Sequence, residues 1–137
     1  MDATRLREFA TRYTAAWGSQ DPVSVASFFA PSGSLTINHG SPAVGRDAIS
    51  ASARGFMTAF PDMVVTMDDI SHERDRVVYR WTLTGTNTGP GGSGRPVRIS
   101  GYEEWTFGAD DLIAASQGQF DEAEYQRQLQ AGVGPSR

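Results

Sequence analysis

The stretch VVYRWTLTGTNTGPGGSGRPVRISGYEEWTF, residues 77–107, decides the fold of this chain. Residues 77–86 and 97–107 are rich in β-branched and aromatic side chains, a composition that favours strands. Between them, residues 89–94 read G-P-G-G-S-G and form a flexible connection. Strands joined in this way pair antiparallel, so the stretch predicts a long hairpin.

Further strands lie on both sides of this hairpin. Before it, Met63, Val65 and Met67 recur at every second residue, and a polar turn follows at 72–75. After it, a turn at 108–111 leads into a last strand at 112–120. One earlier strand is predicted at 35–39, followed by a turn over 40–45.

Two helices are predicted before the first strand. The first has one apolar face, made by Leu6, Phe9, Tyr13, Ala16 and Trp17. Asp21 and Pro22 open the second, because Asp caps a helix well and Pro needs no N–H at the first helical position. Its expected buried side is Val25, Phe28 and Phe29, and Pro31 is expected to end it.

Two more helices follow. A third, after residue 45, is predicted from apolar side chains at helical spacing, namely Ile49, Ala53, Phe56, Met57 and Phe60. It should stop at Phe60, because Pro61 disfavours a helical residue before it. A short tail helix carries Ala123, Tyr125 and Leu129. The helices must cover one face of the strands, which predicts an α+β fold.

Composition narrows the function. The 137 residues suit one domain, expected at 1–131, with a flexible tail at 132–137. Sixteen acidic residues against twelve basic ones, all arginine, argue against a nucleic-acid partner. Cysteine is absent, which excludes thiol chemistry and disulfides. No apolar run reaches membrane-spanning length and no signal peptide is visible, so we expect a cytoplasmic protein without a membrane partner.

Several short strings in this order resemble the SnoaL-like polyketide cyclase family of the nuclear transport factor two-like superfamily. They are AAWGSQD at 15–21 with FFAP at 28–31, VGRDAI at 44–49, FPD at 60–62, RWTLTGTNTGP at 80–90, and FD at 120–121 with the later QL at 128–129. The resemblance covers nearly the whole chain. It implies a cone-shaped, curved, mostly antiparallel sheet wrapped around the N-terminal helices, with a deep apolar pocket.

The resemblance also implies an activity. Members of this family include cofactor-independent cyclases that close rings by intramolecular aldol chemistry, and the superfamily includes isomerases and lyases. We therefore expect a polyketide-like carbonyl substrate, no cofactor and a homodimer formed by the outer sheet face. A non-catalytic ligand-binding or dimerisation domain of the same fold stays open, because fold does not fix function.

Asp121 is the first candidate for catalysis. It stands where the resemblance places the general acid/base, and burial would raise its pKa towards neutrality. Alternation along the last strand puts Gln117 and Gln119 on the same face, where they would bind a substrate oxygen. The alternative is structural, since Asp121 and Glu124 have the spacing of a helix-capping box.

Other candidates come from the pocket walls. Tyr13 resembles the position of an enolate-stabilising hydroxyl in ketosteroid isomerases, although an aromatic residue at helical spacing also suits a plain core position. Trp17, Phe56 and Trp105 are expected to contact substrate. Asn38 would polarise a carbonyl from the end of the first strand. Its neighbour His39 points to the opposite face if the strand continues.

The remaining charged strand residues leave the inner face undecided. Glu103, Trp105 and Phe107 share one face of their strand, and Tyr102 and Glu104 share the other. We expect most of these charges to be exposed, and a glutamate inside the cone to be paired with an arginine. Two histidines 33 residues apart, without a surrounding motif, predict no metal site.

Overall fold

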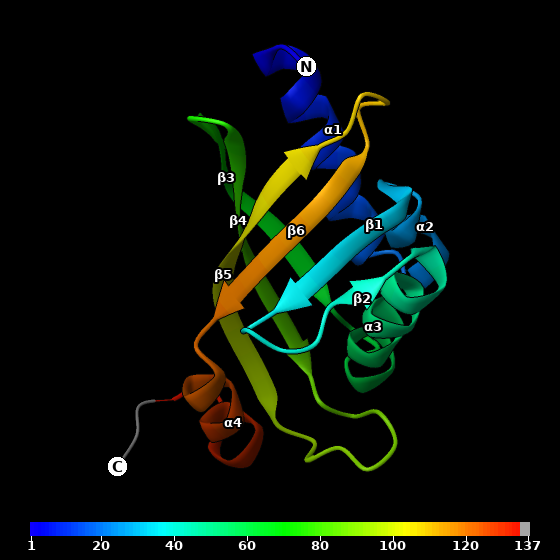
Figure 1. Cartoon of the computed structure of the whole chain (residues 1–137). Coiled ribbons are helices and arrows are strands. Elements are labelled where there is room, and N and C mark those ends of the chain that lie inside the picture. Colours follow the sequence, from blue (N-terminus) through cyan, green and yellow to red (C-terminus); the bar gives the residue numbers. More distant parts are fainter. Residues whose placement is uncertain (135–137) are drawn as a thin grey trace.

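The computed structural model describes residues 1–134, in which the helices lie against a single curved sheet (Figure 1). The helices of this part are α1 (Ala3–Trp17), α2 (Pro22–Ala26), α3 (Arg46–Ala59) and α4 (Glu122–Ala131). Its strands are β1 (Phe29–Ile37), β2 (Ala43–Val44), β3 (Val64–Glu73), β4 (Arg76–Thr86), β5 (Pro96–Phe107) and β6 (Ile113–Phe120). The α+β class is confirmed, whereas residues 135–137 of the predicted tail lie outside the described residues.

The sheet has the strand order β2-β1-β6-β5-β4-β3 within the described residues. Strands β3 to β6 follow one another as an antiparallel meander, as the hairpin pattern predicts. Strand β1 joins this meander by pairing parallel with β6, and β2 pairs antiparallel with β1. The sheet is therefore mostly antiparallel, and β5 and β6 lie near its middle.

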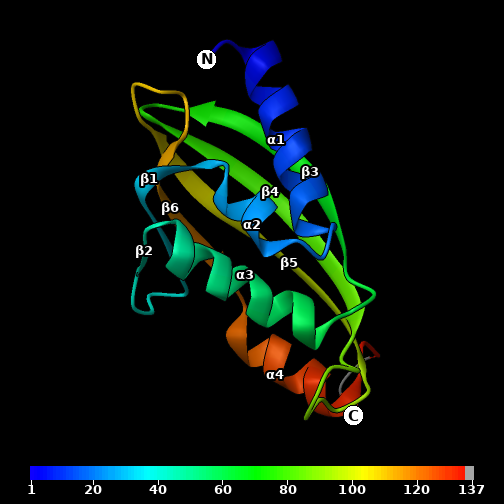
Figure 2. The ribbon, with the colours of Figure 1, turned by 90° about the vertical axis from the view of Figure 1, so that its right-hand side faces the viewer.

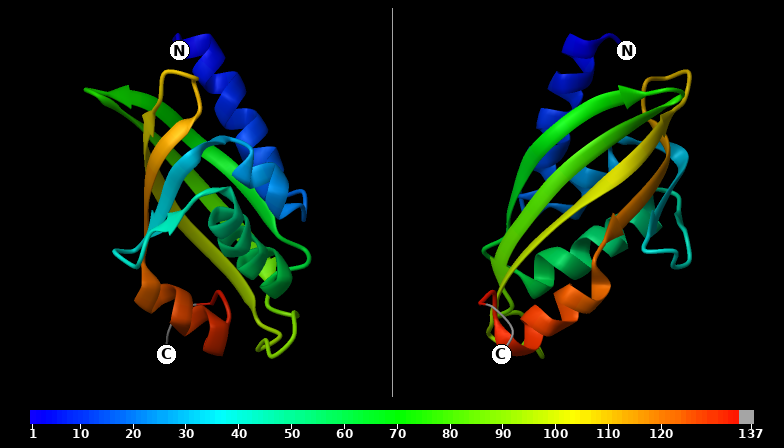
Figure 3. Two further views of the ribbon diagram at one scale, coloured as in Figure 1. Left: turned by 45° about the vertical axis from the view of Figure 1, so that its right-hand side comes forward. Right: turned by 90° about the vertical axis from the view of Figure 1, so that its left-hand side faces the viewer.

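Helices α1, α2 and α3 lie on the concave side of the sheet, and α4 lies at one end (Figure 2). No helix of the described part of the chain lies on the opposite face (Figure 3). Helix α1 is capped by Asp2, whose carboxylate accepts a hydrogen bond from the backbone N–H of Arg5 at 2.8 Å. None of the helices in residues 1–134 is long and apolar enough to cross a membrane.

The apolar face of α1 is buried inside the curve of the sheet. Tyr13 is fully buried and Trp17 is 9% exposed, as the helical spacing predicts. The ring of Tyr13 meets Trp105 edge to face, at 5.0 Å between centroids, and Trp105 stacks on Tyr79 at 4.8 Å. Register shifts between β3 and β4, between β5 and β6, and between β1 and β6 mark bulges, which bend a sheet.

The boundary between α2 and β1 differs from the prediction. Helix α2 ends at Ala26 and Phe29 already belongs to β1, so the predicted helix was too long and the predicted strand began too late. Pro31 is accommodated because the β1–β6 register shifts between Phe29 and Ser34, where no regular ladder requires its missing N–H. The strand also ends earlier, at Ile37.

Two turns are shorter than predicted. Strand β3 continues to Glu73, which is paired with Arg76, so only Arg74 and Asp75 connect β3 to β4. Arg74 has a φ of 63°, the left-handed conformation that such tight connections need. Within the predicted turn at 40–45, residues 43–44 form β2. The first error arises because the polar residues His72 and Glu73 were read as loop, and the second because the Gly, Ser and Pro residues around 43–44 indicated a turn.

Candidate functional site

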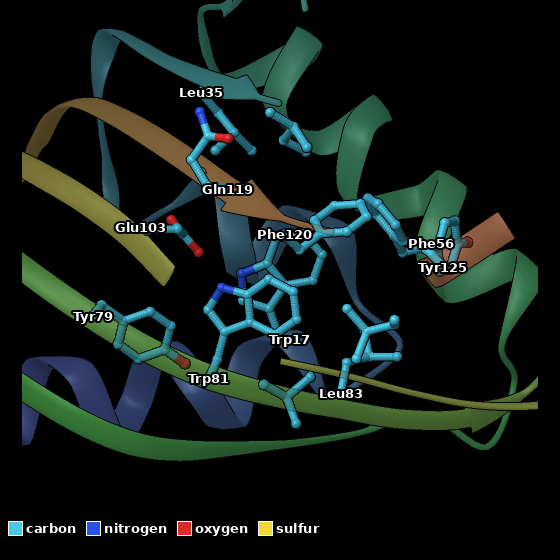
Figure 4. A pocket seen from close by; sticks show the side chains of 14 residues that line it. Trp17, Leu35, Phe56, Tyr79, Trp81, Leu83, Glu103, Gln119, Phe120 and Tyr125 are labelled. Carbon is cyan, nitrogen blue, oxygen red and sulfur yellow. The ribbon is translucent and has the colours of Figure 1, made fainter. Parts of the chain in front are cut away.

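A cavity opens between the concave face of the sheet and helices α1, α3 and α4 (Figure 4). It encloses about 680 Å³ of atom-free space, a value that includes its open mouth. Its wall is almost wholly apolar. The lining side chains include Leu35, Ile37, Phe56, Val65, Trp81, Leu83, Ile99, Phe120 and Tyr125. Such a wall suits an apolar ligand.

Glu103 is the acidic residue of this lining. It lies in β5, where its partners across the sheet are Tyr79 of β4 and Gly118 of β6. Alternation along β5 turns Glu103 and Trp105 to the concave side, and only 7% of Glu103 is exposed. A carboxyl group is therefore held in an apolar wall near the middle of the sheet.

Three neutral donors surround one oxygen of this carboxyl group. Oε1 of Glu103 accepts hydrogen bonds from the Tyr13 hydroxyl at 2.9 Å, the Trp105 indole N–H at 3.0 Å and the Ser116 hydroxyl at 2.7 Å. Oε2 has a single, longer contact of 3.2 Å with the Tyr13 hydroxyl. Because Oε1 is saturated, Oε2 is the oxygen with capacity left for a ligand or a proton.

Burial raises the pKa of Glu103, because the charged carboxylate loses water in the apolar wall. The hydrogen bonds from Trp105, Ser116 and Tyr13 oppose this effect by stabilising the charged form, but burial prevails. No arginine pairs with this carboxylate within residues 1–134. A glutamate with a raised pKa is a stronger base than an exposed one.

The two tyrosines beside Glu103 stay protonated. Burial, and then the charge of Glu103, raise the pKa of Tyr13 well above its ordinary value. Burial likewise raises the pKa of Tyr79, whose hydroxyl lies 2.6 Å from that of Thr14. Tyr13 therefore serves as a hydrogen-bond donor rather than as a base.

The structure brings several of the predicted site residues together. Trp17, Phe56 and Gln119 line the cavity. Trp105 and Tyr13 are buried behind Glu103 and reach the site through their hydrogen bonds to it. Their predicted roles in substrate contact and catalysis remain predictions.

Asp121, in contrast, lies outside the cavity. It is exposed and caps helix α4, accepting a hydrogen bond from the backbone N–H of Glu124 at 3.0 Å. The capping alternative is thus confirmed, and the burial expected for a catalytic Asp121 is wrong. The side chain of Gln117 does not face the cavity either, because Gln117 is exposed whereas its neighbours Ser116 and Gly118 are buried.

Asn38 fixes the backbone instead of facing the cavity. Its φ of 50° places it in a left-handed turn after β1, and its side-chain oxygen accepts the backbone N–H of Phe120 at 2.9 Å. His39 is exposed, and its Nε2 lies 3.2 Å from the amide nitrogen of Gln119. The expected strand alternation at these two residues is wrong because β1 ends at Ile37.

Charged strand residues divide between the two faces. Glu104 pairs with Arg76 and Arg80 lies over the Tyr102 ring at 5.6 Å, all on the side away from the cavity. Glu103 is the exception to the expectation that most of these charges are exposed. The expectation that a glutamate inside the cone would be paired with an arginine was wrong. The sequence signal for Glu103 was its position on one face with Trp105 and Phe107. Its partner Ser116, and Tyr79 and Trp81 in the cavity wall, had no comparable signal.

A family model described as a SnoaL-like domain matches residues 10–116. No curated protein matches the chain. Among solved structures, a Jannaschia species CCS1 protein named as a SnoaL-like polyketide cyclase has a TM-score of 0.81 at 23% identity, over 95% of this chain and 94% of its own.

Two more solved structures share the fold. A Catenulispora acidiphila protein with a ketosteroid isomerase-like fold, in complex with trimethylamine, has a TM-score of 0.76 at 21% identity, covering 93% of this chain and 98% of its own. The epoxide hydrolase/cyclase-like enzyme SalBIII is named for a role in pyran ring formation in the polyether salinomycin. It has a TM-score of 0.76 at 15% identity, covering 90% of this chain and 95% of its own. At these identities the likeness concerns the fold alone.

Proposed function

Because the chain belongs to the SnoaL-like domain family, we propose that it is a small-molecule enzyme in which Glu103 transfers a proton at a carbon beside a carbonyl group. The observation that carries this proposal is the position of Glu103, a carboxyl group buried in the wall of an apolar cavity with one oxygen left unsaturated. The substrate class is an apolar carbonyl compound of the polyketide kind.

The proposed step uses Oε2 of Glu103. The ionised carboxylate takes a proton from the carbon next to the carbonyl, and the electron pair of the broken C–H bond moves to the carbonyl oxygen to give an enolate. Donors from Tyr13, Trp105 and Ser116 hold Oε1 and thereby fix the direction of Oε2. The apolar wall excludes water, which strengthens these interactions.

The enolate then has two routes. Its carbon forms a bond to a second carbonyl of the same molecule, which is aldol ring closure, and the new alkoxide takes the proton back from Glu103. Alternatively, in a substrate with a C=C bond next to the C–H carbon, the enolate is conjugated and the same proton returns to the far carbon of that bond, which shifts the double bond and is isomerisation. Neither route consumes an oxidant or a further reactant. Of these two routes, the names of the Jannaschia protein and of SalBIII support ring closure.

Deuterium exchange tests this proposal without the natural substrate. α-Tetralone, an apolar bicyclic ketone, carries a CH₂ group beside its carbonyl, and a base in the cavity exchanges these protons in D₂O. We expect the wild type to accelerate the exchange and Glu103→Gln to lose at least about 100-fold of that acceleration. Asp121→Asn is the matched control and should retain it.

The outcomes separate the two function classes. If Glu103→Gln accelerated the exchange as much as the wild type does, Glu103 would be rejected as the base. Binding of α-tetralone without any exchange would instead favour a non-catalytic ligand-binding domain.

The assembly remains a prediction. Within residues 1–134, the sheet face opposite the cavity carries no helix (Figure 3). It presents polar and charged side chains, among them Thr82, Ser100 and Glu104. The family resemblance implies that two copies pair through this face.

A further inference from the structure

Two tryptophans line the cavity next to the residues that surround Glu103. Trp17 lies four residues after Tyr13 on α1, a rise of about 6 Å along the helix. Trp81 lies two residues after Tyr79 on β4, about 6.6 Å along the strand. Across the two strands, Tyr79 is paired with Glu103 and Trp81 with Gly101. Gly101 is two residues before Glu103 on β5, so Trp81 lies on the cavity side next to the carboxyl group. Helix and sheet thus each place an indole ring beside the proposed base.

Most hydrogen-bond donors around Glu103 are already engaged. Tyr13, Trp105 and Ser116 all donate to Glu103 itself. The Tyr79 hydroxyl is bonded to Thr14, and the amide nitrogen of Gln119 contacts His39. The three donors to Glu103 and the Tyr79 hydroxyl cannot hold a ligand oxygen without giving up a partner, and the amide of Gln119 has one N–H left.

The indole N–H groups are different. Of the three tryptophans, the one whose N–H donates a hydrogen bond within residues 1–134 is Trp105. The N–H of Trp17 is buried and makes no hydrogen bond of normal geometry within residues 1–134, although buried donors are nearly always paired. It lies near the Tyr13 hydroxyl and partly offsets the rise in the pKa of Tyr13 that burial causes, but that hydroxyl is directed at Glu103. Figure 4 shows Trp17, Trp81 and Glu103 around the same cavity. An unpaired donor in a ligand cavity is paired when a ligand brings an acceptor.

We propose that the indole N–H groups of Trp17 and Trp81 bind an acceptor oxygen of the ligand and hold its neighbouring carbon against Glu103. This inference rests on the proposed function and deepens it, because it defines the ligand as an apolar compound with a carbonyl oxygen facing the tryptophans. A pair of neutral donors also stabilises the negative charge that develops on that oxygen as the enolate forms. The tryptophans then act as specificity-determining residues.

A matched pair of probes tests the inference. α-Tetralone and tetralin have the same carbon skeleton and differ by one carbonyl oxygen. Their affinities are measured by calorimetry for the wild type, Trp17→Phe, Trp81→Phe and the double variant. The ratio of the two affinities cancels the effect of the smaller phenyl ring on packing, because both probes experience it.

In the wild type, we expect α-tetralone to move an indole N–H signal of Trp17 or Trp81 downfield in the two-dimensional proton–nitrogen spectrum, and tetralin to leave it in place. In the double variant, the α-tetralone to tetralin affinity ratio should fall about three- to tenfold, the value of one hydrogen bond. The single variants assign the loss to one or both rings. If the double variant does not fold, the wild-type spectrum and the single variants decide.

An unchanged ratio in the variants, or indole signals that respond equally to both probes, would overturn the inference. The proposed function of Glu103 is contradicted by a different result. Binding of tetralin without a preference for the ketone rejects the role of the tryptophans and leaves Glu103 untouched. Exchange that survives in Glu103→Gln rejects the base and leaves the tryptophans in place. Failure of both probes to bind rejects both proposals.

Discussion

The hydroxyl group of Tyr13 lies 2.9 Å from Oε1 of Glu103, so a residue of helix α1 holds a carboxyl group of strand β5 that comes 90 positions later in the sequence. This contact joins the helix inside the curve to the middle of the sheet. It also fixes the proposed base in the direction of the cavity. Packing and site geometry therefore depend on the same pair of residues.

Replacing Tyr13 with Phe tests this relationship. The variant keeps the ring and removes a donor that stabilises charged Glu103, so the pKa of Glu103 should rise further. We expect the pH midpoint of α-tetralone exchange to move upwards and stability to fall by about 1–2 kcal/mol. Exchange rates across pH and urea unfolding measure the two effects.

Tyr79→Phe is the matched control for that variant. Its hydroxyl contacts Thr14 and makes no hydrogen bond to Glu103. It should lose a similar amount of stability without a change in the pH midpoint. Equal midpoints for Tyr13→Phe and wild type would show that the Tyr13 contact does not influence the base.

The raised pKa of Glu103 also predicts how stability depends on pH. Between the ordinary value of 4.5 and the raised native value, the folded protein keeps a proton that the unfolded chain has lost. The contribution of Glu103 to stability therefore falls as pH rises through this window. Glu103→Gln carries no charge at any pH and should be more stable than the wild type at neutral pH.

Urea unfolding from pH 4 to pH 8 measures this difference. Glu104→Gln is the control, because Glu104 lies on the other face and pairs with Arg76. Its stability should follow the wild-type curve in shape. A Glu103→Gln curve that runs parallel to the wild type would contradict a raised native pKa.

Much of the fold was predictable from periodicity, but the site was not. After Pro61 the spacing of apolar residues changes from that of a helix to that of a strand, and Tyr13 and Trp17 have helical spacing. Both patterns follow from local backbone geometry and are visible in the sequence itself. Which face of β5 lies inside depends on long-range packing, and the sequence left it undecided. Asp121 was misplaced for the same reason, since strand alternation ended one residue before it, at Phe120.

Asp121→Ala should affect stability and leave catalysis intact. Loss of the cap on α4 is expected to cost about 0.5–2 kcal/mol. Exchange of α-tetralone at temperatures well below unfolding should equal that of the wild type. Thermal unfolding and the exchange rate are the measurements, and a lost rate in a folded variant would restore Asp121 as a candidate base.

Gly101 provides a test of the cavity wall. A Cβ there would lie 2.4 Å from the Gln119 carbonyl oxygen and 2.6 Å from Cζ2 of Trp81. Gly101→Ala should therefore displace the indole ring, cost about 1–3 kcal/mol and weaken tetralin binding. Gly55→Ala, on α3 with nothing within 4 Å, is the control and should stabilise the protein by about 0.5–1 kcal/mol.

The predicted homodimer is tested by sedimentation. A dimer at micromolar concentration is expected for the wild type. Ser100→Arg places a large charge on the uncovered sheet face and should shift the protein towards monomer, whereas Arg54→Ala on α3 should not. A monomeric wild type would contradict the prediction.

The most direct test of the central claim is the pKa of Glu103 itself, measured by NMR from the carboxyl carbon of labelled protein and assigned with Glu103→Gln. A carboxyl group buried in an apolar wall and poised for proton transfer should titrate above the ordinary value of 4.5. A midpoint at or below 4.5 would mean that Glu103 is a stabilised anion and not the proposed base.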